Sequence, residues 1–145
     1  MAVNDHHQTS VTFILDSGAD LHIMPTSQAQ RLGLEIIPMR GMRAVDASGN
    51  DLGVRGKVRL DGVLKSITGA SVHLKLTVVV ADRVTRCLLS TGQLIKSGFS
   101  VLHEPHLTKI CSDNVEVALV RDGVRDVVKF RVKPSRSQES TTEEA

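Results

Sequence analysis

The chain has 145 residues with a formal net charge of +2, and 41% of them are hydrophobic but only 2% aromatic. This length fits one domain, and the hydrophobic content is enough for a core built from Val, Leu and Ile. The interspersed charges argue against a nucleic-acid surface, which would need clustered Lys and Arg, and no apolar run reaches the length of a membrane span.

The first third of the chain predicts short extended segments around one helix. Residues 1–10 are polar, and we expect a flexible tail there. β-Prone residues fill 11–15 and, after a turn, 21–24. A short helix is predicted over 26–32, because the threonine at its start can act as an N-cap and a glycine follows its end. Residues 34–38 again favour a strand.

The middle of the chain predicts two turns and one regular strand. Turn-forming residues at 46–51 separate the β-prone runs 42–45 and 52–60, which predicts a hairpin tip. An Asp-Gly pair at 61–62 predicts another turn. Apolar residues then occupy every second position of 72–80, with polar residues at most positions between them, so this segment should be a half-buried strand.

The last third predicts a second short helix at 93–97, a strand at 99–103, and a hairpin that joins 115–120 to 124–132 through an Asp-Gly turn. Residues 134–145 are mostly Ser, Thr, Gln and Glu, which cannot bury a core, so we expect a disordered tail. The sum is eight or nine short strands with one or two short helices. That pattern predicts an all-β domain, either a barrel or a sandwich.

An Asp-Ser-Gly-Ala tetrapeptide follows the first strand, with Asp16 directly after the apolar residues 13–15. The tripeptide Asp-Ser-Gly is often no more than part of a turn. It also suits a catalytic carboxylate: Ser17 can hydrogen-bond to a partner loop, Gly18 lets a backbone N–H approach the acid, and Ala19 is small enough for two such loops to meet. Two facing carboxylates about 3 Å apart share one proton, so one can act as base and the other as acid.

One chain supplies only one acid of this kind. The nearest internal echo is Leu88-Leu89-Ser90-Thr91-Gly92, and there Ser90 stands where the acid would be needed. A serine cannot act as the second carboxylate. An active enzyme would therefore need Asp16 from a second copy, which predicts a two-fold symmetric homodimer.

Two segments carry a family resemblance. Phe13-Ile14-Leu15-Asp16-Ser17-Gly18-Ala19-Asp20-Leu21-His22-Ile23-Met24 resembles the active-site segment of retropepsin-like aspartic proteases. The segment from Cys87 to Val101, with Leu88-Leu89-Ser90 and Gln93-Leu94, resembles the end of the protease domain in Copia-type LTR-retrotransposon polyproteins. The resemblance covers residues 11–133, of which 111–133 either belong to the barrel or form an appended hairpin. It implies a closed β-barrel with a flap hairpin.

The resemblance also implies the roles of individual residues. Asp16 would be the catalytic carboxylate in a loop with Ser17, Gly18 and Ala19. The flap that closes over a peptide would be Val45–Gly53, and its substrate-binding residues would be Val45, Asp46, Ala47, Ser48 and Gly49. The strand supporting the site would be Leu88, Leu89 and Ser90. The chain departs from the family at Asp20, where Ser or Thr is common, and in a flap without aromatic residues.

The expected function is therefore cleavage of peptide bonds in a polyprotein by a homodimer, in the cytoplasm or within virus-like particles, with no cofactor and no membrane partner. The alternative is a catalytically silent or domesticated module that dimerises or binds peptides. His103-Glu104-Pro105-His106 is one residue short of a zinc-protease helix and contains a helix-breaking proline, so no metal is expected there. The paired histidines of the N-terminal tail are expected to be solvated. Cys87 and Cys111 are expected to stay reduced.

Overall fold

The computed structural model describes residues 10–113 and 115–132. This part of the chain consists mainly of strands with two short helices, which confirms the prediction of an all-β protein. The predicted tails lie outside the described residues, apart from Ser10, which begins the first strand. None of the described helices is long and apolar enough to cross a membrane.

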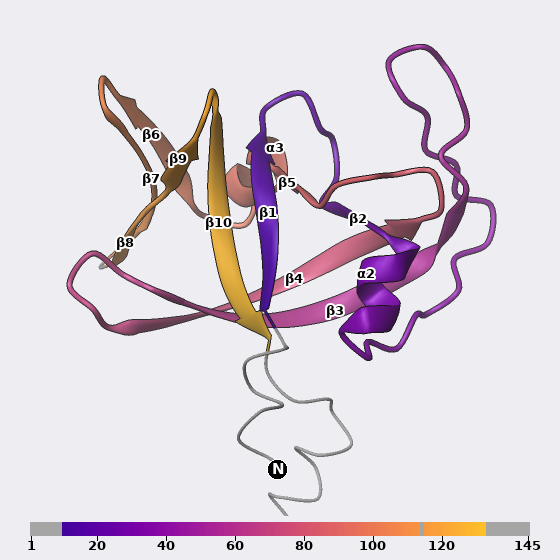
Figure 1. The fold of residues 1–145 in the computed structure, drawn as a ribbon, viewed down its shortest axis with the longest axis horizontal. Helices are drawn as coiled ribbons and strands as arrows, with labels where there is room; N and C mark the ends of the chain where they lie inside the picture. Colours follow the sequence, from indigo (N-terminus) through magenta and orange to yellow (C-terminus); the bar gives the residue numbers. More distant parts are fainter. Residues whose placement is uncertain (1–9, 114, 133–145) are drawn as a thin grey trace, which may run out of the picture.

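The strands form two sheets (Figure 1). The larger sheet has the order β1 (Ser10–Asp16), β5 (Leu88–Ser90), β2 (Ile23–Pro25), β4 (Ser71–Ala81), β3 (Val54–Lys65), β10 (Arg125–Val132) and β9 (Val120–Asp122). β10 pairs with β1 as well, so the pairing returns to the first strand. The smaller sheet contains β6 (Ser100–Glu104), β7 (Leu107–Ser112) and β8 (Val115–Ala118), and the helices are α2 (Thr26–Arg31) and α3 (Thr91–Lys96).

The core is mainly aliphatic, as the composition required, with two phenylalanines, Met24 and Cys87 among its buried residues. Phe13 on β1 and Phe130 on β10 are fully buried, and their rings meet edge to face with centroids 5.5 Å apart. Leu60, Val78 and Leu89 are fully buried in the same cluster. β-Branched side chains suit this core because they pack well on a pleated surface.

The longest strands, β3 and β4, form one antiparallel hairpin. In β4 the side chains of Leu74, Leu76, Val78 and Val80 are buried, whereas those of His73, Lys75 and Thr77 are exposed. This alternation confirms the predicted strand. The turn predicted at residues 61–62 is wrong: β3 runs through both residues, and the chain turns at 66–70 instead. Gly62 has a packing role, because a Cβ there would lie 2.6 Å from the ring of Phe130.

Replacing Gly62 by alanine should therefore destabilise the fold by about 1–3 kcal/mol, because the added methyl group overpacks the buried ring of Phe130. Urea unfolding measures this change. Gly92→Ala is the matched control: this glycine lies in α3, a Cβ there meets nothing closer than 3.8 Å, and alanine favours the helix. Equal stability of the two variants would contradict the packing role of Gly62.

The C-terminal third is built differently from its prediction. The segment 115–120 is not one hairpin arm but two strands, of which β8 pairs with β7 and β9 pairs with β10. The turn at Gly123 is present as predicted. β7 was missed because its alternation is short and broken by Lys109. Thr108 on β7 joins the sheets, since its Oγ1 donates to Asp126 Oδ2 on β10 at 2.9 Å.

Two smaller predictions also need correction. Thr26 does not cap α2; Pro25 occupies the N-cap position, and Thr26 Oγ1 donates instead to Asp82 Oδ1 at 2.7 Å. The strand expected at 34–38 is reduced to a single bridge between Ile37 and Lys57. The second helix and the strand after it are present as α3 and β6.

Candidate active site

Asp16 is the last residue of β1, and the chain leaves the sheet directly after it. Its carboxylate Oδ1 accepts the backbone N–H of Gly18 at 2.8 Å. Asp16 is half-buried, whereas Ser17 and Gly18 are exposed. Within the described residues the Ser17 hydroxyl makes no hydrogen bond. The loop therefore presents its acid at the molecular surface, next to two small residues.

Ser90 lies beside Asp16 in the sheet. β1 and β5 pair in parallel with Asp16 opposite Ser90 and Leu15 opposite Leu89. Ser90 is fully buried, and its Oγ donates to the carbonyl of Ala19 at 2.8 Å while accepting the N–H of Gln93 at 3.1 Å. The second hydrogen bond caps α3. Ser90 thus ties the loop after Asp16 to the start of α3.

His22 also supports this loop, and no role was predicted for it from the sequence. It is 5% exposed, and its Nδ1 accepts the backbone N–H of Ser90 at 3.0 Å. An Nδ1 that accepts cannot carry a proton, so the ring is neutral here. Burial lowers the pKa of His22 to about 4. The available signal was a histidine between the apolar residues Leu21 and Ile23, a position that requires a hydrogen-bond partner when buried.

A third contact fixes the same loop: Gln93 Nε2 donates to the carbonyl of Asp20 at 3.0 Å. The side chain of Asp20 itself is exposed. The loop after Asp16 is therefore held at Ala19, Asp20 and His22 by contacts from β5 and α3. Three fixed points in such a short loop orient the carboxylate before any ligand is bound.

The segment predicted as the flap projects from the body of the molecule as a loop (Figure 1). It is closed by one bridge between Val45 and Asp51, so the β-prone runs predicted on either side are not paired strands, and β3 starts only at Val54. Asp46 organises the tip, since its Oδ1 accepts the N–H groups of Ser48 and Asn50 at 2.8 and 2.9 Å. Chiefly the Asn50 N–H lowers the pKa of Asp46. The other predicted flap residues, Ala47 and Gly49, are exposed at this tip.

The base of this loop is attached to the end of β4. The carbonyls of Leu52 and Gly53 accept the N–H groups of Arg83 and Asp82 at 2.9 Å. Asp82 also forms an ion pair with Arg55, with 2.9 Å between Nε and Oδ2, and the Arg55 hydrogen bond lowers the pKa of Asp82. The tip is thus free of the sheets while its base is fixed.

A small apolar cluster lies between the two predicted elements of the site. Ile23, Val79 and Ala81 are buried at its centre. The side chains that pack against them are only partly buried. They come from the loop after Asp16, the flanks of the predicted flap, the segment before β5 and β5 itself: Leu21, Met42, Leu52, Val54, Val84 and Leu88. This arrangement provides an apolar wall near Asp16.

No group of metal-ligating side chains occurs in the described residues. His103 and His106 lie at the β6–β7 connection, where His103 Nδ1 is 3.2 Å from Thr108 Oγ1. The paired histidines near the N-terminus lie outside the described residues. Both cysteines are free, and burial raises the pKa of the Cys87 thiol to about 11, so it is unreactive.

The comparisons agree with this geometry at the level of the family. A family profile described as "Aspartyl protease" matches residues 1–128, which is most of the chain. A search of curated proteins found no match, and a search of solved structures found none either. The match spans the Asp16 loop, the flap segment and β5. This chain belongs to the aspartyl protease family.

Proposed function

We propose that the protein is an aspartic endopeptidase of the retropepsin type whose active site forms between two copies of the chain. The observation that carries this proposal is the pairing of Asp16 with Ser90. The strand position that could have supplied a second acid holds a serine committed to structural hydrogen bonds. The second carboxylate must then be Asp16 of another copy.

The mechanism follows from two such carboxylates. At about 3 Å they share one proton, because both cannot ionise so close together. One removes a proton from a water held between them, and the other protonates the peptide carbonyl oxygen. Gly18 N–H, which binds Asp16 Oδ1, fixes the orientation of each acid. Mildly acidic to neutral pH suits this chemistry, since one carboxyl must keep its proton.

The loop itself supports the dimer. Within one copy, a Cβ at Gly18 would meet only Asp16 Oδ1, at 3.4 Å, and its φ is not positive, so a single chain does not explain the glycine. A second loop packed against it does. The exposed Ser17 hydroxyl is then available to hydrogen-bond across the two-fold axis.

The substrate would be an extended peptide held between the flap and the apolar wall. The flap residues, with Asp46 organising the tip, would bind its backbone as an added strand, and the apolar wall around Leu21 and Leu52 would favour aliphatic side chains. The additional pairing of β10 with β1 supports the closed barrel that this proposal includes. We infer polyprotein processing of the Copia retrotransposon type, in the cytoplasm or in virus-like particles, as the setting.

A second candidate is a module of the same fold that dimerises or binds peptides without cleaving them. The intact Asp16-Ser17-Gly18 loop favours the enzyme, because the carboxylate of Asp16 is oriented by the Gly18 N–H and the rest of the loop is held by contacts from β5 and α3.

The proposed dimer can be tested through the distance between the two loops. Ser17→Cys should form an intermolecular disulfide under mild oxidation, because the two exposed Ser17 residues would face each other across the two-fold axis. Ser27→Cys, at an exposed position on α2, is the matched control and should not crosslink. The wild type shows how much crosslinking the native cysteines, Cys87 and Cys111, give by themselves. Sedimentation gives the oligomeric state in parallel. A chain that stays monomeric at high concentration would contradict the proposed enzyme.

A further inference from the structure

A hollow in the molecule lies along β1, and positively charged side chains line it. It is a groove of about 560 Å³ whose lining residues come from β1, α2, the segment before β5 and the β9–β10 hairpin: Ser10, Val11, Thr12, Ile14, Pro25, Gln28, Arg31, Thr85, Arg86, Cys87, Asp122, Arg125 and Val127. Three of these are arginines, and Asp122 is the one acidic member. The rest of the polar lining is hydroxyl and amide groups.

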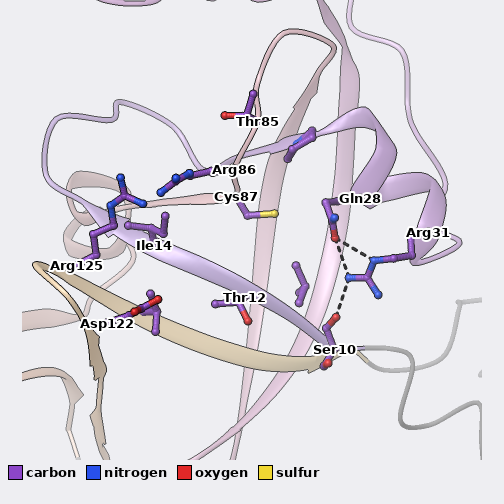
Figure 2. A pocket seen from close by; sticks show the side chains of 13 residues that line it. Ser10, Thr12, Ile14, Gln28, Arg31, Thr85, Arg86, Cys87, Asp122 and Arg125 are labelled. Atoms are coloured by element: carbon purple, nitrogen blue, oxygen red, sulfur yellow. Dashed lines mark hydrogen bonds between the residues drawn. The ribbon is translucent and has the colours of Figure 1, made fainter.

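The arginines lie at the two ends of the groove (Figure 2). At one end Arg31 is held in place, since its guanidinium donates to the carbonyl of Ser10 and to Gln28 Oε1, both at 2.8 Å. At the other end the guanidinium groups of Arg86 and Arg125 point toward one another beside Ile14. Neither makes a hydrogen bond or ion pair within the described residues, unlike Arg55 at the flap, which is paired with Asp82.

Like charges repel, so an anion bound between Arg86 and Arg125 would be favoured at this end of the groove. Asp122 lines the same groove but forms no ion pair with either arginine in the part of the chain that the structure describes. A carboxylate or phosphate oxygen pair matches the guanidinium fork. The charge of this end therefore selects an anionic ligand.

The groove also offers an open strand edge. On this side β1 pairs with β5 only from Ile14 onward, and Ile14 N–H donates to the carbonyl of Cys87 at 2.9 Å. The N–H and C=O groups of alternate residues point the same way along a strand, so those of Thr12 face the groove. An extended peptide can add a strand to this edge, because its backbone carries alternating N–H donors and C=O acceptors. A small anion or a nucleic-acid backbone lacks this alternation.

We propose that this groove binds an acidic peptide segment, extended along β1 beside Thr12, with a carboxylate side chain between Arg86 and Arg125. The four residue steps from Ser10 to Ile14 span about 13 Å, so the groove takes roughly five residues. Ile14 is two residues from Asp16, hence a segment held here lies next to the candidate active site. The inference does not depend on proteolysis, because binding alone reveals it.

The test is the binding of fluorescein-labelled hexaglutamate to the full chain, followed by anisotropy at low and high salt. Arg86→Glu combined with Arg125→Glu should weaken binding at least about tenfold, and the two Lys replacements should weaken it less, since charge remains but the fork is lost. The matched control is Arg40→Glu with Arg59→Glu, which changes the net charge equally at exposed arginines outside the groove. This control should bind much as the wild type does.

The Thr12 amide provides a second readout, because its NMR resonance should shift and its hydrogen exchange should slow when hexaglutamate binds. Several outcomes would overturn the proposal: no binding by the wild type, equal loss in both pairs of variants, or an unchanged Thr12 amide. Full competition by inorganic phosphate at the concentration of the peptide would reject the peptide as ligand, and tighter binding of a single-stranded oligonucleotide would assign the groove to nucleic acid.

Discussion

Asp16→Asn should lower the rate of peptide cleavage by about 10³-fold or more, because the amide can neither share the proton nor activate the water. The fold should remain intact, since the Asn side-chain oxygen can still accept the Gly18 N–H that now binds Oδ1. The rate is measured on a peptide library or on the precursor. Asp113→Asn is the matched control, because this exposed acid follows β7, outside the site, and should cleave as the wild type does.

The same variant tests the shared site through mixing. If each active centre needs one Asp16 from each copy, a mixed dimer of one wild-type chain and one Asp16→Asn chain should be inactive. Random pairing should therefore lower the activity of the wild-type chains. Wild-type activity should fall to about one half with an equal amount of Asp16→Asn and to about one tenth with a ninefold excess. Activity that is independent of added variant would indicate that one chain suffices. Cleavage that persists in Asp16→Asn alone would reject the aspartic mechanism, and the absence of cleavage by either protein with an intact dimer would favour the peptide-binding module.

The local parts of the fold could be predicted from the sequence because their signals are local. The alternation in β4 and the short helix α3 each depend on neighbouring residues, and both were predicted. Asp61-Gly62 shows the limit of this approach. The pair is a typical turn signal, yet β3 passes through it because Gly62 leaves room for Phe130, which is almost seventy positions away in sequence. Long-range packing overrides local preference there.

The candidate site also combines local sequence signals with long-range contacts that only the folded chain shows. The family resemblance implied that the strand containing Ser90 supports the Asp16 site, but only the parallel pairing of β1 with β5 shows that Ser90 lies opposite Asp16. His22 was overlooked because its function comes from a contact with Ser90 across 68 residues. The groove that contains Arg86 and Arg125 could not be predicted from the sequence either, because the segment before β5 and the β9–β10 hairpin come together only in the folded chain.

His22 should make the protein acid-sensitive. The neutral ring is required in the fold, where burial lowers the pKa of His22 to about 4, whereas in the unfolded chain its pKa is the ordinary 6.5. Between these values the unfolded state takes up a proton that the folded state does not, so stability falls as the pH drops from 6.5 toward 4. The loss of unfolding free energy should reach about 2–3 kcal/mol.

Urea unfolding at several pH values between 7 and 4 measures this loss, and His22→Asn should flatten the dependence, because asparagine keeps an acceptor for the Ser90 N–H but does not titrate. His73→Asn is the matched control, since this histidine is exposed on β4 and its replacement should leave the dependence as in the wild type. Equal slopes for wild type and His22→Asn would contradict the role of His22.

Because protonation breaks the Ser90 contact that holds the Asp16 loop, the acid limit of cleavage should move with the same substitution. The proposed dyad, which needs one protonated carboxyl, should thus be active only above the pH at which its supporting histidine is protonated.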